Sequence, residues 1–261
     1  MSVKNSLKIL SVGNSFAMDT SEYVPQLALD LGFESVHIGT LYIGGCSIRR
    51  HYNNAQSNAQ AYEYYVNDGD EWRKTPNVSI EDAIKSADWD FISIQHGTGD
   101  GSRYTREDSY EKLASLVEYI REKASPKTKI AFNMAWVMEP DSTHPEIRSY
   151  NGDQLRMYEN LVKITERVVM PTSGLDIVSP AGTAVQNARA VGKLGCLCRD
   201  GFHLSYGMGR YIAALTFTGA LTKTSPDDVT YIPAGVSERE AKIAIECAKN
   251  AIIKPFDVTK A

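Results

Sequence analysis

The sequence predicts an α/β fold: a three-layer α/β/α sandwich around a central, mostly parallel, five-stranded sheet. Short apolar segments alternate with longer helical ones, a rhythm that predicts parallel strands joined by right-handed helical crossovers. The first apolar segment, Leu7–Val12, stops at a Gly-Asn-Ser turn, as a buried parallel strand does where the chain bends sharply. Prolines and glycines are scattered, and no linker or repeat interrupts the 261 residues. We therefore expect one domain spanning residues 1–261.

The expected elements follow one another along the chain. The five strands are Leu7–Val12, Ser35–Ile43, Trp89–Ile94, Thr128–Met134 and Leu175–Val178. The helices are Tyr23–Leu31, Ser109–Ala124, Gly152–Val169 and, after the last strand, Gly207–Leu221. In such sheets ligands bind beyond the carboxyl ends of the strands. Ser15, Gly45 and Gln95 each fall just past a predicted strand end, so we expect them at that edge.

One segment, at about residues 55–85, departs from this rhythm. Ala61–Val66 and Glu71–Lys74 indicate two strands joined by a turn with Asp-Gly chemistry. This pattern predicts a β-hairpin inserted between the second and third strands of the sheet. Ser79, followed three residues later by an acidic residue, resembles the cap of a short helix. The hairpin either shields an edge of the sheet or forms an aromatic wall over the site.

The charge of the chain argues against several classes of partner. The chain has 28 basic and 32 acidic residues, a net charge of -4, and no basic stripe with interleaved aromatic residues. We therefore expect it to bind neither nucleic acid nor an anionic membrane. The expected partner is a small neutral molecule, and the oligomeric state stays open.

We expect no metal ion, cofactor or membrane segment either. Four cysteines are too few for a disulfide framework, and Cys196 and Cys198 lack the two-residue spacer of a zinc or redox pair. No apolar run approaches membrane-spanning length, and residues 1–5 are too short for the charged region of a signal peptide. The expected location is the cytoplasm, or the periplasm if an export signal has been removed.

Two short motifs, almost the whole chain apart, carry the candidate chemistry: Gly-Asn-Ser-Phe at residues 13–16 and Asp-Gly-Phe-His at residues 200–203. A serine hydroxyl is a poor nucleophile at neutral pH, so it needs an imidazole to take its proton and an acid to orient that imidazole. Ser15 would be the nucleophile, and Asp200 and His203 would supply both other groups from one loop. Taken alone, Ser15 is better explained as an ordinary helix-cap or turn serine, and the pairing with Asp200 and His203 is what favours the nucleophile. The alternative for His203 is a helix-capping histidine that Asp200 merely holds.

Taken in order, these motifs resemble the sequence blocks of the SGNH or GDSL hydrolase superfamily, and in particular its bacterial DUF4886 branch. Residues 13–16 match the first block, with Asn14 where many members have Asp. Gly-Gly-Cys-Ser at residues 44–47 matches the glycine of the second block, and residues 200–203 match the fifth. The resemblance covers nearly the whole domain except the hairpin. It implies a flavodoxin-like sheet and a serine ester hydrolase with Ser15, His203 and Asp200 as its catalytic residues.

The resemblance also implies three donors for the oxyanion of the reaction. They are the backbone N–H of Ser15, a backbone N–H of the glycine block, for which Gly45 is the best match, and an Asn amide of the third block. The third block departs from the family pattern, because residues 94–100 read Ile-Gln-His-Gly-Thr-Gly-Asp. We expect Gln95 to substitute, since its amide N–H does the same job from one methylene further out.

Other side chains are expected to line the site. His96 is expected to form a wall of the cleft or to bind substrate. Asn133 and Trp136 follow the fourth strand and are expected to look into the cleft, where Trp136 would stack on a sugar ring or an acyl chain; packing in the core is the equal alternative for Trp136. Three arginines are candidates for binding an acidic substrate group: Arg49, Arg50 and Arg199.

Two functions from different classes follow from these observations. The first is an ester hydrolase that removes short acyl groups, with acetyl expected, from a carbohydrate or another small ester; the substrate rests on the resemblance. The second is a carbohydrate-binding protein that keeps the fold and has lost efficient catalysis, which the irregular third block motivates. A flavodoxin-like nucleotide binder is disfavoured, because no glycine-rich phosphate loop follows the first strand.

Overall fold

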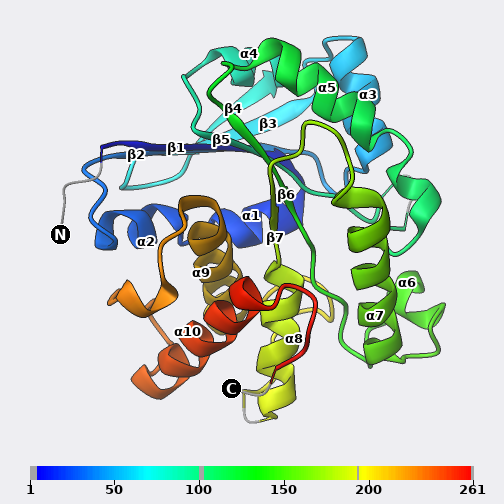
Figure 1. Ribbon diagram of the computed structural model, residues 1–261, viewed down its shortest axis with the longest axis vertical. Helices are drawn as coiled ribbons and strands as arrows, with labels where there is room; N and C mark the ends of the chain where they lie inside the picture. The colour runs from blue at the N-terminus through cyan, green and yellow to red at the C-terminus, as the bar shows by residue number, and fades with distance from the viewer. Residues whose placement is uncertain (1–4, 100–102, 193, 260–261) are drawn as a thin grey trace.

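A seven-stranded mixed sheet forms the centre of the molecule (Figure 1). The computed structural model describes residues 5–99, 103–192 and 194–259. The strands are β1 (Leu7–Gly13), β2 (Val36–Tyr42), β3 (Tyr62–Asn67), β4 (Arg73–Val78), β5 (Phe91–Ile94), β6 (Lys129–Asn133) and β7 (Ile177–Ser179). They lie side by side in the order β4-β3-β2-β1-β5-β6-β7.

The five strands expected from the sequence are all present and parallel to one another. β1 pairs with β2 on one side and with β5 on the other, and β6 and β7 follow β5 outward. These five strands have the flavodoxin-like order, in which the chain first moves to one side of β1 and then crosses to the other. The predicted fold class is therefore confirmed. The crossover brings the carboxyl ends of β1, β2 and β5 together at one edge of the sheet.

The predicted hairpin exists and shields an edge of the sheet, the first of its two expected roles, by joining the sheet itself. β3 runs antiparallel to β2, with Val66 opposite Gly39, and β4 pairs with β3 as the outer strand. β3 buries Tyr62 and Tyr64, whereas nearly all of β4 is exposed. The sheet therefore has seven strands where five were expected, because β3 satisfies the backbone groups that the free edge of β2 would leave unpaired.

Helices cover both faces of this sheet (Figure 1). One face carries α1 (Ser15–Ser21), α2 (Val24–Asp30), α8 (Ala181–Val191), α9 (Met208–Thr222) and α10 (Glu238–Ile253). The other face carries α3 (Ile48–Gln56), α4 (Ile80–Lys85) and α5 (Leu113–Lys123). The remaining elements are η1 (Glu107–Tyr110), α6 (Pro145–Arg148), α7 (Gln154–Ile164), η2 (Thr165–Val169) and η3 (Pro226–Asp228).

The strands divide their apolar side chains between two cores, one on each face. In β1, Ile9 packs into the core beneath α1 and α9, and Leu10 and Val12 pack into the core beneath α3 and α5, as the alternation of a strand requires. Most of α9 is buried, which accounts for its apolar and small residues. Within the described ranges, no helix is both long enough and apolar enough to cross a bilayer.

Helices α1, α3, α6, α8 and α10 are additional to those expected. α10 begins with a capping box in which Ser237 and Glu240 satisfy each other's backbone N–H groups, a signal that the sequence does contain. α8 has no comparable signal. It buries Gln186 and Asn187 together with its apolar residues, so its sequence lacks a polar face.

Glu146, in α6, is a buried carboxyl that is only partly satisfied. It is 1% exposed. Its Oε1 accepts hydrogen bonds from the backbone N–H of Thr105 at 3.0 Å and from the hydroxyl of Thr105 at 2.8 Å. Its Oε2 is buried and has no hydrogen-bond partner among the described residues. Burial raises the pKa of Glu146 to about 7, although the hydrogen bonds from Thr105 lower it.

Because of the raised pKa of Glu146, we expect the free energy of unfolding to fall as pH rises. Between the ordinary value of 4.5 and about 7, the folded protein holds a proton that the unfolded chain has lost. We therefore expect the free energy of unfolding to decrease across this window by up to about 3 kcal/mol, and Glu146→Gln to remove the decrease. Urea unfolding of the wild-type protein and of Glu146→Gln at about pH 5 and about pH 7.5 measures this decrease. An equal decrease in Glu146→Gln would contradict the assignment.

Candidate active site

Ser15 lies at the turn between β1 and α1, at the carboxyl edge of the sheet. Gly13 allows α1 to pack closely against the end of β1, because a Cβ at this position would lie 2.4 Å from Cβ of Ala17. Asn14 caps α1: its side-chain oxygen accepts the N–H of Phe16 at 2.9 Å. Together, the close packing at Gly13 and the cap at Asn14 fix the position of the half-buried Ser15.

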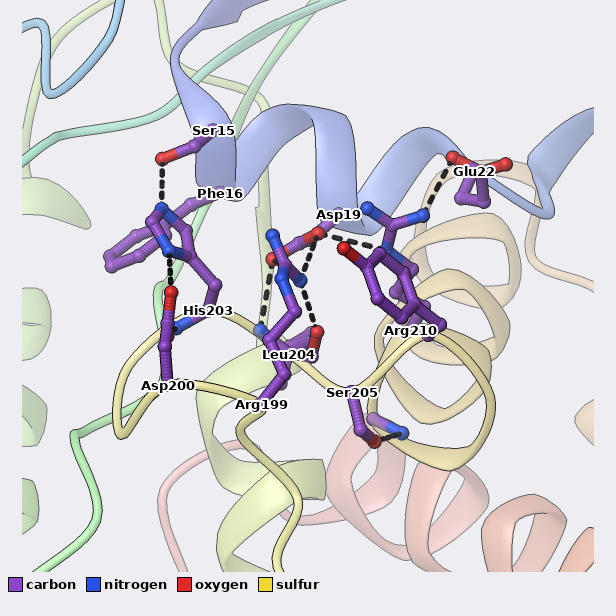
Figure 2. Close-up of polar contacts among 12 residues, drawn as sticks. Ser15, Phe16, Asp19, Glu22, Arg199, Asp200, His203, Leu204, Ser205 and Arg210 are labelled. Carbon is purple, nitrogen blue, oxygen red and sulfur yellow. Dashed lines mark hydrogen bonds and ion pairs between the residues drawn. The ribbon is translucent and has the colours of Figure 1, made fainter.

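Asp200 and His203 lie on the loop before α9, and this loop meets Ser15 (Figure 2). Ser15 Oγ is 2.7 Å from His203 Nε2, and Asp200 Oδ2 is 2.6 Å from His203 Nδ1. The other carboxylate oxygen of Asp200 accepts the backbone N–H groups of Phe202 at 3.2 Å and of His203 at 2.8 Å. The structure thus brings the three side chains into one continuous chain of hydrogen bonds.

The charge of Asp200 determines which nitrogen of His203 carries the proton. Burial opposes the ionisation of Asp200, but the hydrogen bonds from His203 and from the N–H of Phe202 outweigh it, and the pKa of Asp200 lies below its usual value. An ionised carboxylate can only accept, so His203 Nδ1–H donates to Asp200. In the neutral imidazole Nε2 is then the acceptor for the Ser15 hydroxyl. In this arrangement an imidazole can take the proton of a serine.

Gly45 lies beside the Ser15 turn because Asn14 connects the two segments. Asn14 Nδ2 donates to the carbonyl of Cys46 at 3.2 Å and to the carbonyl of Gln95 at 3.4 Å, so one side chain joins the turns after β1, β2 and β5. Gly45 has a φ of +63°, in the left-handed region that favours glycine. The N–H groups of Ser15 and Gly45 have no acceptor among the described residues. Both are therefore candidates for binding an anion.

The loop after β5 packs against Gly45 backbone to backbone. The N–H of Gly99 donates to the carbonyl of Gly45 at 2.6 Å. A Cβ on Gly97 would lie 2.5 Å from the carbonyl oxygen of Cys46, so no side chain fits there. This close approach is a physical reason for the Gly-Thr-Gly sequence of the third block. Asp100, which ends the block, lies outside the described residues.

Gln95 is not presented to the site as the expected third donor. Its Cβ lies 3.7 Å from the point where a Cβ of Gly13 would stand, and the residue is 2% exposed. Neither Oε1 nor Nε2 reaches solvent or has a hydrogen-bond partner among the described residues. An oxyanion donor must be accessible to substrate. The expectation for Gln95 is therefore not met in this conformation, because the residue follows a central strand and its amide is enclosed by the protein.

The three expected substrate-binding residues do not face the cleft either. His96 is 1% exposed, and its ring nitrogens bond to two backbone carbonyl groups. Asn133 is buried and donates to the hydroxyl of Thr20. Trp136 is buried and donates to the carbonyl of Phe202. The substrate-binding expectation is wrong for His96 and Asn133, whereas for Trp136 the equal alternative, packing in the core, is confirmed. The protein encloses all three side chains and uses their donor groups.

Trp136 instead supports the loop that carries the acid and the base. Its indole N–H reaches the carbonyl of Phe202 at 2.7 Å. Its ring packs on Phe16, with the centroids 4.8 Å apart, and Phe16 in turn meets the ring of His203 edge-on at 5.9 Å. The aromatic side chains beneath the site thus pack the imidazole into place.

Two of the candidate arginines are bound to other parts of the protein. Arg49 forms an exposed ion pair with Glu111 at 2.9 Å. Arg199 donates to Asp19 at 3.0 Å (Figure 2). Arg50 lies in the first turn of α3. Within the part of the chain that the structure describes, no group of three or more His, Cys, Asp or Glu side chains is arranged to hold a metal ion.

The sequence prediction did not include Asn14 as a connector or Asp19 as an acceptor. The cap at Asn14 can be recognised from its place before a helix. Its contacts with Cys46 and Gln95, however, join segments 32 and 81 positions apart. The partners of Asp19 are between 180 and 191 positions away. No local pattern indicates contacts of this range.

The chain resembles one family over almost its whole length. The family model described as "Domain of unknown function (DUF4886)" matches residues 8–251. The crystal structure of a DUF4886 family protein from Bacteroides uniformis ATCC 8492 is 34% identical to the chain, with a TM-score of 0.91, and the match covers 98% of each chain. None of the curated proteins matches.

More distant structures share the fold. A member of the lipolytic protein G-D-S-L family from Veillonella parvula DSM 2008 has a TM-score of 0.52 and 15% identity, over 84% of this chain and 100% of its own. Axe2, an acetylxylan esterase from Geobacillus stearothermophilus, has a TM-score of 0.51 and 18% identity, over 85% of this chain and 96% of its own. The fold is thus the one found in GDSL-like and SGNH-like hydrolases, and the chain belongs to the DUF4886 family.

Proposed function

We propose that the protein is a serine ester hydrolase that works through an acyl-enzyme. The observation that carries the proposal is the hydrogen-bonded chain from Ser15 through His203 to Asp200, with 2.7 and 2.6 Å between the bonded atoms. A serine without such partners is a weak nucleophile at neutral pH. The fold shared with a G-D-S-L family protein and an acetylxylan esterase supports the same reaction class by analogy.

In the proposed reaction, Ser15 Oγ attacks the carbonyl carbon of the ester while its proton passes to His203 Nε2. Asp200 stabilises the imidazolium that forms. When the tetrahedral intermediate collapses, the bond to the alcohol oxygen breaks and His203 gives the proton to that oxygen. Water then attacks the acyl-enzyme with the same proton transfers and releases the acid and free Ser15.

We assign the stabilisation of the oxyanion to the backbone N–H groups of Ser15 and Gly45. Both groups lack an acceptor among the described residues, and Asn14 joins their two segments. Donors that are already oriented stabilise developing charge without reorganisation during the reaction. This assignment leaves Gln95 out of the reaction.

The substrate that we propose is a short acyl ester, such as an acetyl ester, of a carbohydrate or another small alcohol. Two half-buried aromatic rings next to the acid–base pair support it: Phe202 and His144 have ring centroids 5.2 Å apart, and Phe202 lies 4.1 Å from the ring of His203. Aromatic faces of this kind suit stacking against a sugar ring.

A second candidate is a carbohydrate-binding protein of the same fold with little catalysis. The enclosed amide of Gln95 favours it, because losing one oxyanion donor lowers kcat by about 10²–10³ in comparable chemistry. Absence of hydrolysis of any short ester would favour this second function, and activity that depends on Ser15 would exclude it.

Ser15→Ala is the direct test of the proposed nucleophile. We expect hydrolysis of p-nitrophenyl acetate to fall by at least about 10³-fold, because no hydroxyl remains to form the acyl-enzyme. Mass spectrometry after treatment with an organophosphonate should show one adduct, on Ser15, in the wild-type protein and none in the variant. Ser125→Ala, a serine before β6 at the opposite edge of the sheet, serves as the control that keeps both properties. Activity that survives in Ser15→Ala refutes the assignment.

Gly97→Ala tests whether the backbone of Gly45 contributes to the reaction. The added Cβ would lie 2.5 Å from the carbonyl of Cys46 and 2.6 Å from the carbonyl of Gly45, so this segment must shift. We expect kcat for the same ester to fall by about 10²-fold, the scale of one displaced donor. Gly44→Ala, whose Cβ would have its nearest neighbour at 3.4 Å, is the control and should stay near wild type. Equal activity of the two variants speaks against Gly45 as a donor.

Gln95→Met separates the two assignments of the oxyanion donors. If the amide stays enclosed during the reaction, its loss leaves kcat within about threefold of wild type. The free energy of unfolding should be unchanged or higher, because a buried amide without partners is removed. Steady-state kinetics and urea unfolding measure both. A loss of about 10² or more in kcat would instead restore Gln95 as the third donor.

A further inference from the structure

Asp19 is an almost completely buried carboxylate one helical turn beyond Ser15. Residues four positions apart share one face of a helix, so Asp19 and Ser15 project from α1 toward the same part of the protein. The side chain of Asp19 is 1% exposed. A buried carboxylate is costly unless hydrogen bonds and opposite charges surround it. Its partners therefore indicate its role.

Three groups around the acid–base pair donate to Asp19 (Figure 2). Arg199 Nη1 lies 3.0 Å from Oδ1 and 3.2 Å from Oδ2 of Asp19. The backbone N–H of Leu204 donates to Oδ2 at 2.9 Å, and Arg210 Nε donates to Oδ1 at 2.8 Å. Arg199 immediately precedes Asp200, and Leu204 immediately follows His203. One carboxylate thus holds both ends of the loop, residues 199–204.

The loop is also closed on itself where Asp19 binds it. The N–H of Arg199 donates to the carbonyl of His203 at 2.8 Å. The guanidinium of Arg199, besides binding Asp19, donates to the carbonyl of Leu204. The loop therefore meets Asp19 as a compact unit, and a shift at either end is transmitted to His203.

The other supports of the loop come from a different part of the chain. The backbone N–H of Glu139 donates to the carbonyl of Gly201 at 2.8 Å, and the indole of Trp136 holds the next carbonyl. These residues follow β6, and neither belongs to the helix of the nucleophile. Among the described residues, the hydrogen bonds between α1 and residues 199–204 all involve Ser15 or Asp19.

We infer that Asp19 is a positioning residue that sets the distance between the Ser15 hydroxyl and the His203 imidazole. A carboxylate suits this role because its two oxygens accept several hydrogen bonds at once, whereas an amide of the same shape exposes two donors to the arginines. An apolar side chain would fill the space without orienting the loop. The kinetic consequences of the inference rest on the proposed function, but its structural consequences do not.

The chain offers a matched control for Asp19. Glu22, at the end of α1, pairs with Arg210 at 3.0 Å. No hydrogen bond joins Glu22 to residues 199–204 in the described chain. Glu22→Gln therefore removes a carboxylate charge from the same arginine without touching the loop.

The first test compares Asp19→Asn with Glu22→Gln. We expect Asp19→Asn to lower kcat for p-nitrophenyl acetate by about 10²-fold, because a displacement of about 1 Å is enough to disrupt proton transfer. KM should stay within about threefold, since Asp19 does not touch substrate. The rate of phosphonate labelling at Ser15 should fall in the same proportion as kcat. Glu22→Gln should match wild type in all three quantities.

The second test needs no activity. Hydrogen–deuterium exchange should become at least about tenfold faster at the amides of Phe202 and His203 in Asp19→Asn than in Glu22→Gln. These amides donate to Asp200 and not to Asp19, so their exchange reports the whole loop. Faster exchange at Leu204 alone would show only the loss of its own acceptor.

The outcomes separate this inference from the proposed function. A folded Asp19→Asn with kcat and labelling near wild type, and with faster exchange at Leu204 only, overturns the inference. Activity that survives Ser15→Ala overturns the proposed function, and the exchange measurement still decides about Asp19. If Asp19→Asn does not fold, Arg199→Gln gives the same readouts. The side chain of Arg199 is 26% exposed and that of Asp19 only 1%, so replacing Arg199 leaves fewer buried polar groups without a partner.

Discussion

The docking of residues 199–204 onto α1 is the interaction on which the site depends. Ser15 and His203 are 188 positions apart, so no local structure holds them together. The proposed proton transfer requires them within hydrogen-bond distance, and contacts from several elements provide that distance. β1 and the cap at Asn14 fix one partner, whereas Trp136 and Asp19 fix the other from two sides.

Close approach of backbone to backbone is the second constraint at this edge of the sheet. The turns after β1, β2 and β5 meet at the point where the chain changes direction, and the side chain of Asn14 joins them. Gly13, Gly45 and Gly97 each stand where a Cβ would crowd a neighbour. Among the described residues the N–H groups of Ser15 and Gly45 have no acceptor, and for this reason we propose them as the oxyanion donors.

The parts of the fold that could be predicted are those in which burial imposes a pattern. The parallel strands are covered on both faces, so Leu7–Val12 and Trp89–Ile94 are mostly apolar, with four apolar residues out of six in each. The pairing of the hairpin with β2 could not be predicted, because it depends on which edge of the finished sheet is free. The sequence did not predict α8, because its buried face contains polar residues and so lacks the usual pattern of an amphipathic helix. Asn187, for example, is completely buried and donates to the carbonyl of Cys247.

By itself the sequence determined the candidate catalytic groups and their approximate place. A serine after the first strand, and an acid and an imidazole three residues apart in one loop, specify both the groups and the edge where they meet. Only the tertiary structure decided which side chains face that edge. Gln95, His96 and Asn133 are buried because other segments of the chain cover them, and these segments also bond to the side chains of His96 and Asn133. Such contacts form between finished elements, so no spacing within a single segment encodes them.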